Sequence, residues 1–161
     1  MKHPYAGVPD RQIWGKEPGI SDGSVLDPVS DAPFRIFRQD RIVTAGSCFA
    51  QHLARFVDKA GFNHHVTESA HPVVPANVAR KHNYGLFSAR YGNIYTARQL
   101  RQLLQRAYGE FTPVAAAWRA TDGSGVVDPL RPQIQPGGYL SEAELKAERE
   151  YNFRSIRRAI E

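Results

Sequence analysis

The sequence predicts an α/β fold. Residues 41–45 are short, apolar and bounded by polar residues, which is typical of a buried strand. A helical pattern begins a few residues later, and residues 62–67 can form a second strand. A strand, a helix and a strand within about thirty residues is the order of a right-handed βαβ unit, in which the two strands run parallel.

The first helix is predicted over residues 49–60, because apolar residues recur there at a helical spacing on one face. Gly61 follows at the position where glycine commonly ends a helix. The apolar stripe consists of Phe49, Leu53, Phe56, Val57 and Ala60. Residues 71–92 contain Pro72 and Pro75 near their start and are predicted to form a loop.

A second helix is predicted to begin after Thr96, because Gln99 stands three residues later and completes a capping box. Gly109 ends it. Its buried stripe is expected to be Leu100, Leu103, Leu104 and Ala107, and its wet face Arg98, Arg101, Gln102, Gln105 and Arg106.

A hairpin is predicted within residues 118–130, around the turn residues 122–125. Ser141 and Glu144 form a further capping box, which begins the last helix, and Leu140 with Leu145 fits a hydrophobic staple. Residues 1–33 are rich in Pro, Gly, Asp and Ser and are predicted to form an irregular arm, so the folded domain is expected over residues 34–161.

Composition narrows the functional classes. The chain has 161 residues, a net charge of +5 and a single cysteine, so an internal disulfide is excluded. The sequence lacks an apolar run as long as a membrane span or a signal peptide, so we expect no membrane association and a cytoplasmic location. Its basic residues are scattered, which disfavours nucleic-acid binding.

Ser47 is the strongest candidate for chemistry, because it stands where the first strand turns into a helix. Such a turn lies at the carboxyl edge of a sheet, beside backbone N–H groups that favour negative charge. Position alone equally fits an N-cap serine that only accepts a backbone hydrogen bond. Cys48 is a rival nucleophile at the helix start or, alternatively, a small core residue.

The Gly92-Asn93 pair precedes the second predicted helix in a loop rich in aromatic residues. It can supply an oxyanion hole, through a glycine amide or the Asn93 side chain, or it can simply be a turn. Asp128 and Arg131 lie in a segment stiffened by Pro129 and Pro132. Arg131 can clamp a carboxylate or phosphate of a substrate, or pair with Asp128 to lock a loop; the structural alternative is favoured.

Three motifs resemble those of the GSCFA family, in the order expected. They are Gly46-Ser47-Cys48-Phe49-Ala50, the segment 90–100 (RYGNIYTARQL) and the segment 128–132 (DPLRP). The resemblance covers residues 35–161. This family looks related to the SGNH/GDSL serine hydrolases, although the aspartate that usually precedes their serine is replaced here by Gly46.

The resemblance implies a three-layer SGNH-like sandwich with a mainly parallel sheet, truncated at its C-terminus. In the family, a further strand and a region with the catalytic histidine come later, so the chain is expected to be the N-terminal part of the domain, with the general base beyond Glu161. The implied function is that of a serine esterase or O-acyltransferase acting on a small acyl ester, with a carbohydrate as the expected acceptor.

By the same resemblance, Ser47 is the nucleophile, and the Cys48 backbone N–H with Gly92 stabilises the oxyanion. Asn93 is a further candidate oxyanion donor, while Tyr91, Asp128 and Arg131 are candidate substrate contacts. No cofactor is expected. No metal site is expected either, because His64 and His65 are adjacent and would face opposite sides of a strand. The alternative is a non-catalytic glycan- or partner-binding module in which Ser47 is only a helix cap.

Overall fold

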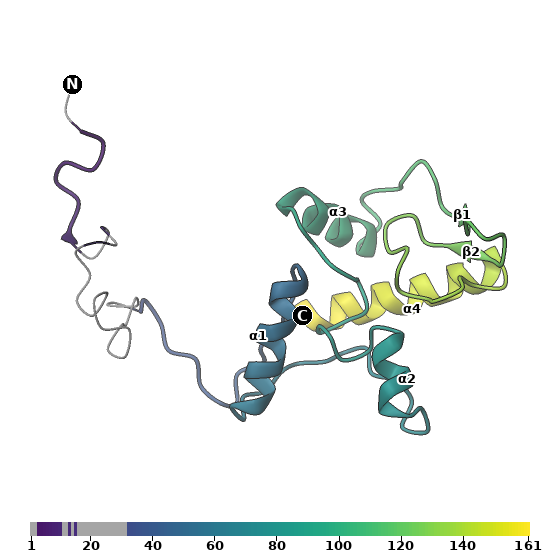
Figure 1. Ribbon diagram of the computed structural model, residues 1–161, viewed down its shortest axis with the longest axis horizontal. Helices are drawn as coiled ribbons and strands as arrows, with labels where there is room; N and C mark the ends of the chain where they lie inside the picture. The colour runs from purple at the N-terminus through teal and green to yellow at the C-terminus, as the bar shows by residue number, and fades with distance from the viewer. Residues whose placement is uncertain (1–2, 11–12, 14, 16–31) are drawn as a thin grey trace. The chain divides into compact units, whose positions relative to one another are not determined.

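The computed structural model describes residues 3–10, 13, 15 and 32–161. The chain divides into two compact units, Met1–Ile36 and Phe37–Glu161. The predicted arm over residues 1–33 lies largely outside the described residues. Every helix and strand described here belongs to the second unit (Figure 1).

The second unit is mostly helical. In chain order its described elements are α1 (Cys48–Lys59), α2 (Ala76–Lys81), α3 (Ala97–Ala107), β1 (Trp118–Arg119), β2 (Val126–Val127) and α4 (Glu142–Ile160). Helix α2 lies inside the segment predicted to be a loop, so that prediction was wrong. Pro75 precedes this short helix with φ −57°, a value that proline imposes and that suits a helix start.

The predicted α/β fold, a three-layer sandwich with a mainly parallel sheet, is contradicted. Among the described residues the only sheet has two strands, β1 and β2, and they are antiparallel. Trp118 pairs with Val127 and Arg119 with Val126, which confirms the predicted hairpin. Beside β2, Tyr139 pairs with Val126 in one isolated antiparallel bridge, through backbone hydrogen bonds of 2.9 and 2.7 Å.

The reason for the missing sheet lies in residues 41–45 and 62–67. They do run parallel, but through one isolated bridge between Ile42 and His64. Two backbone hydrogen bonds hold it: from Ile42 N to Asn63 O at 2.9 Å and from His65 N to Ile42 O at 2.9 Å. Beyond it, the amide of Thr44 bonds the Ser88 hydroxyl at 2.9 Å, so a side chain takes the place of a neighbouring strand.

Helix caps agree well with prediction. The hydroxyl of Thr96 accepts from Gln99 N, and that of Ser141 accepts from Glu144 N, each at 3.1 Å. The side chains of Gln99 and Glu144 bond back to the amides of Tyr95 and Leu140 respectively. The predicted staple is wrong, however, because Leu140 is 91% exposed.

The hydrophobic core lies between α3, α4 and the extended segment 86–94. Helix α3 packs on α4, and β2 also contacts α4 (Figure 1). The core residues are Phe87, Ala89, Tyr91, Ile94, Leu103, Ala107, Phe153 and Ile156. Of the predicted α3 stripe, Leu103 and Ala107 are buried, Leu104 is half-buried and Leu100 is exposed. Arg106, predicted to be on the wet face, is buried.

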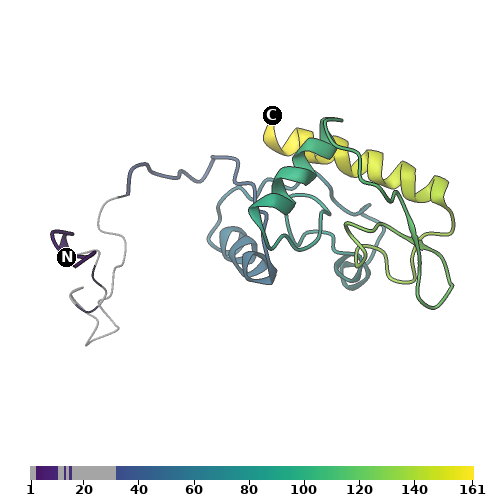
Figure 2. The same ribbon diagram turned by 90° about the horizontal axis from the view of Figure 1, so that it is seen from above.

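Helix α1 touches this core through the small residue Ala50. It packs against no other helix or strand in the described part of the chain, and Figure 2 shows it separated from α4. Its small residues Ala50 and Ala54 turn inward. The large residues of its predicted apolar stripe are exposed: Phe49 by 77%, Leu53 by 54% and Phe56 by 65%.

Candidate functional site

Ser47 is the N-cap of α1, in extended backbone conformation and half-buried. Its Oγ accepts a hydrogen bond from Phe49 N at 3.3 Å, and its carbonyl accepts from Ala50 N at 2.9 Å. The amide of Cys48 has no acceptor within the described residues. The Cys48 side chain is exposed rather than in the core. The turn therefore offers a hydroxyl and one free backbone N–H side by side.

Gly46 joins this turn to the Gly92-Asn93 loop. Its φ of 154° and a Cβ that would lie 2.8 Å from the Ala50 Cβ require glycine at this position. The Gly46 carbonyl accepts from Ile94 N at 2.7 Å. The glycine thus permits the backbone contact that brings two of the three motifs together.

Hydrogen bonds from two glutamines to Asn93 strengthen this contact. Gln51, on the first turn of α1, donates to Asn93 Oδ1 at 3.0 Å, and Gln99 of α3 donates to Asn93 O at 3.0 Å. Gly92 has φ 74°, in the region that favours glycine, and turns the chain between buried Tyr91 and half-buried Asn93. The Asn93 amide therefore already has an internal partner at its oxygen.

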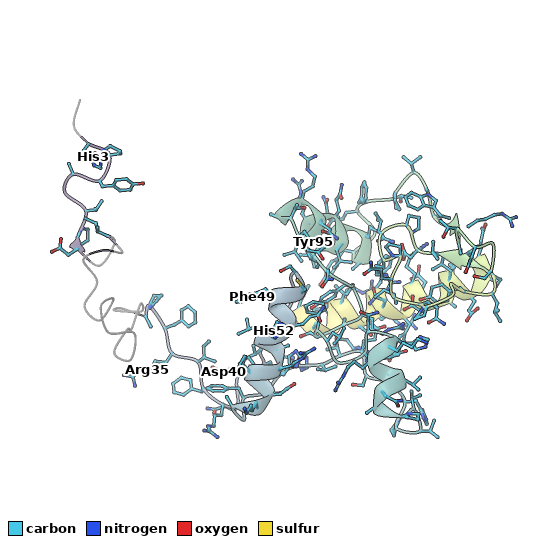
Figure 3. All side chains as sticks on the ribbon, viewed as in Figure 1. His3, Arg35, Asp40, Phe49, His52 and Tyr95 are labelled. Atoms are coloured by element: carbon cyan, nitrogen blue, oxygen red, sulfur yellow. The ribbon has the colours of Figure 1, made fainter. Side chains whose placement is uncertain are left out.

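A pocket of about 230 Å³ lies against this loop. Its lining includes Gly92, Asn93, Gln99 and the exposed ring of Tyr95, which Figure 3 labels. Asn83 and Gln133 add further amide groups. Ser47 is not among the lining residues. The pocket is therefore a neighbour of the Ser47 turn, rich in uncharged hydrogen-bonding groups.

Tyr91 of the second motif is also joined to the segment that leads into the Ser47 turn. Its ring packs on Phe87, with centroids 5.6 Å apart, and its hydroxyl donates to Thr44 O. Burial raises the pKa of Tyr91 far above its ordinary value, so the hydroxyl stays protonated and remains a donor. Tyr91 also reaches the edge of the 230 Å³ pocket.

Asp128 and Arg131 lie close together and are buried. Arg131 Nε is 3.3 Å from Asp128 Oδ2, which also lies 3.1 Å from Arg149 Nε and 3.8 Å from Arg106 Nη2. Burial alone would raise the pKa of Asp128, but the arginines and the Leu130 amide hold it below its usual value. Both charges of the motif are thus paired inside the protein.

Arg90 and Glu148 link the second and third motifs, and the sequence analysis did not single them out. Arg131 donates to Arg90 O at 2.9 Å and to Glu148 Oε2 at 2.7 Å. Arg90 Nη1 lies 3.2 Å from Glu148 Oε1, and its guanidinium stacks 4.1 Å from the Tyr84 ring centroid. The signal available in the sequence was Arg90 itself, the first residue of the second motif.

Glu68 is a fully buried carboxyl that the sequence analysis also missed. Its Oε2 accepts from Arg90 N at 2.9 Å and from Asn152 Nδ2 at 2.6 Å. Its Oε1 has no hydrogen-bond partner among the described residues. Burial raises the pKa of Glu68 above its ordinary value despite these two donors and the charges of Arg131 and Arg90.

The side chains of Thr44, His64 and Asp58 also lie close together, and Thr44 stands three residues before Ser47. Thr44 Oγ1 is 2.9 Å from His64 Nε2, and His64 Nδ1 is 3.4 Å from Asp58 Oδ2. At the second distance the two groups are near each other but do not form a hydrogen bond. This order of groups is that of a catalytic triad. Thr44 is only 4% exposed, however, so its hydroxyl fastens the bridge segment and is not open to a substrate.

No group of three or more His, Cys, Asp or Glu side chains among the described residues could hold a metal ion. None of the helices described is long and apolar enough to cross a membrane.

Comparison with known proteins identifies the family. The model of the GSCFA family matches residues 41–160, which include all three motifs. Searches of curated proteins and of solved structures returned no match for this chain. Because the family model covers well over half of the sequence, the chain belongs to the GSCFA family.

Proposed function

We propose that this protein is a serine-dependent esterase or O-acyltransferase that acts on a small acyl ester of a carbohydrate. The hydrogen bond between Gly46 O and Ile94 N carries the proposal, because it unites the Ser47 turn with the Gly92-Asn93 loop. The nucleophile must reach the carbonyl carbon while the oxyanion donors reach the oxygen of the same group, so the two must lie close together, and these two loops are neighbours.

In the proposed reaction, Ser47 Oγ attacks the ester carbonyl and passes its proton to a base. The Cys48 N–H and a Gly92 N–H stabilise the resulting oxyanion, the alcohol leaves, and water or a sugar hydroxyl then takes the acyl group from Ser47. In the described residues the hydrogen bond to Ser47 Oγ comes from the Phe49 amide, so the base is not among its present partners.

The 230 Å³ pocket supports a carbohydrate as the substrate. Sugar hydroxyls both donate and accept, and amide side chains offer both functions. Asn83 and Gln133 line the pocket with such groups, and Tyr95 adds an exposed ring on which a sugar face can pack. The one lining cation, Arg131, is already paired with Glu148 and Asp128.

One observation favours the alternative, a glycan- or partner-binding module without catalysis. The hydroxyl of Ser47 accepts from Phe49 N as an ordinary N-cap does. In that case the amide-rich pocket binds sugar and Ser47 only begins α1.

Labelling with a fluorophosphonate probe separates the two proposals. On the protein as its gene encodes it, Ser47→Ala is expected to abolish labelling and to lower ester hydrolysis by several orders of magnitude. Cys48→Ala is the matched control on the adjacent residue and keeps most of the labelling, because neighbouring helical positions diverge by about 100°.

Circular dichroism checks that both variants fold. Iodoacetamide inactivation together with an active Ser47→Ala variant would instead establish a thiol enzyme. Absence of labelling in the wild type, combined with binding of an acetylated oligosaccharide that Gln133→Ala weakens, would favour the binding module.

A further inference from the structure

A second pocket has no residue of the three motifs in its lining. It has a volume of about 550 Å³, within the usual range for small-molecule sites. The C-terminal part of α3, the following residues 108–116 and the middle of α4 enclose it. Phe111, Pro113 and Phe153 give it an apolar wall.

Three arginines face this apolar wall: Arg106 from α3, and Arg149 and Arg157 from α4. Glu150 is the one acidic residue of the lining, and it is exposed. The nearest buried carboxylate, Asp128, is shared by Arg106, Arg149 and Arg131. One negative charge therefore serves several guanidiniums, and the pocket retains an excess of positive charge.

Arg106 is the most unusual of the three. It is 6% exposed, yet no hydrogen bond to its guanidinium occurs in the described part of the chain. Its closest charged neighbour is Asp128 Oδ2, at 3.8 Å, and its guanidinium lies 5.1 Å from the Phe153 ring centroid. None of its nitrogen atoms is both fully buried and without a partner, so the donors that lack a protein acceptor are accessible at the pocket that Arg106 lines, where a ligand can supply the acceptor.

The other two arginines are held in fixed orientations by backbone carbonyls. Arg149 donates through Nη2 to Ala116 O, and Arg157 donates through Nη1 to Ala107 O. Each guanidinium carries further N–H groups beyond these bonds. Donors fixed in this way lose little side-chain entropy when an anion binds.

We propose that this pocket binds a small organic anion, a carboxylate or phosphate group on an apolar body. The anion takes the free donors of Arg106, Arg149 and Arg157, and the body packs against Phe111, Pro113 and Phe153. Arginine suits either group, because its planar fork pairs with two oxygens at once. This site is separate from Ser47 and does not depend on the function proposed above.

Calorimetric titration at constant ionic strength tests the proposal with four probes: 1-naphthyl phosphate, 1-naphthoate, 1-naphthol and inorganic phosphate. At least one organic anion is expected to bind with a Kd tenfold or more below those of naphthol and inorganic phosphate. The two organic anions distinguish a phosphate site from a carboxylate site.

Variants then locate the binding. Arg106→Gln and Arg157→Gln should each raise the Kd of the tighter probe at least tenfold. Arg98→Gln removes the same charge from an exposed position on α3 and should leave the Kd unchanged. If buried Arg106→Gln fails to fold, half-buried Arg157→Gln decides alone. Absence of saturable binding by both organic anions, or equal weakening in Arg98→Gln, would overturn the proposal.

Discussion

Helices α1 and α4 have the same kind of N-cap but differ in how far their apolar residues are buried. Each has a serine N-cap, at Ser47 and Ser141, and each carries large apolar residues at helical spacing. In α4, Phe153 and Ile156 lie in the core against α3, while Ile160 at the end of the helix is exposed. In α1, Phe49, Leu53 and Phe56 are exposed, Val57 is half-buried, and the small residues Ala50 and Ala54 face inward. Amphipathicity therefore predicts that a helix forms, but not what covers its apolar face.

The difference extends to charges. Around α4, buried carboxylates and guanidiniums form a connected network through Asp128, Arg131 and Glu148. Near α1, His64 contacts Asp58, whose side chain is mostly exposed. We therefore expect the free energy of unfolding to reside mainly in the α3–α4 region, and the following experiments test this comparison.

The largest effect should come from the same substitution made on each helix. Phe153→Ala removes a buried ring from α4 and is expected to destabilise the protein by about 3–5 kcal/mol. Phe56→Ala removes an exposed ring from α1 and should change stability by no more than about 0.5 kcal/mol. Urea denaturation measures both, and equal losses would mean that the α1 stripe is covered in solution.

A comparable loss is expected from breaking the buried network. Asp128→Asn leaves Arg131 and Arg149 without their shared carboxylate and should cost about 3–5 kcal/mol. Asp58→Asn is the matched change beside α1 and should cost about 0–1 kcal/mol. A mild Asp128→Asn variant in the same denaturation assay would show that the arginines find other partners.

The two serine caps should matter less. Ser141→Ala is expected to cost about 1 kcal/mol, because the Glu144 amide loses its acceptor. The bond from Phe49 N to Ser47 is longer, at 3.3 Å, and α1 is less coupled to the core, so Ser47→Ala should cost less. Thermal unfolding ranks the pair, and a larger loss for Ser47→Ala would make the cap, rather than catalysis, the reason for a serine there.

The smallest effect concerns pH. Because its pKa is raised in the folded protein, Glu68 takes up a proton on folding, and stability falls as pH rises from its unfolded pKa through its folded one. Glu68→Gln cannot ionise, so its stability relative to the wild type should increase over that interval. Denaturation curves from pH 4 to pH 7 test this, and a constant difference would contradict the raised pKa.

Local elements were predictable where short-range chemistry determines them. Thr96 with Gln99, Ser141 with Glu144, and the turn at residues 122–125 act within a few residues, and the structure has all three features. The prediction of a parallel sheet was wrong because strand pairing depends on distant residues. Here the Thr44 amide donates to the hydroxyl of Ser88. No periodicity in residues 41–45 could reveal that competitor.

The candidate site was predictable in part for a related reason. The motifs identified the Ser47 turn and the Gly92-Asn93 loop, and the contact between Gly46 and Ile94 joins them. The roles proposed for Ser47, Cys48, Gly92, Asn93 and Tyr91 remain predictions. Arg106 was wrongly predicted to be on the solvent-exposed face, because helical spacing sorts residues by hydrophobicity. It does not show that a buried carboxylate, Asp128, pairs with this arginine in the fold.

The bonds of Glu68 also bear on the order of events during synthesis. Its partner Asn152 lies 84 residues later, and Thr67 bonds the carbonyl of Ser155, 88 residues later. Until the ribosome has released α4, Glu68 must remain hydrated and ionised, and the core residues Phe87 and Tyr91 must remain uncovered by Phe153 and Ile156. A nascent chain with such distant partners folds late and slowly, and it is the kind of chain that chaperones protect.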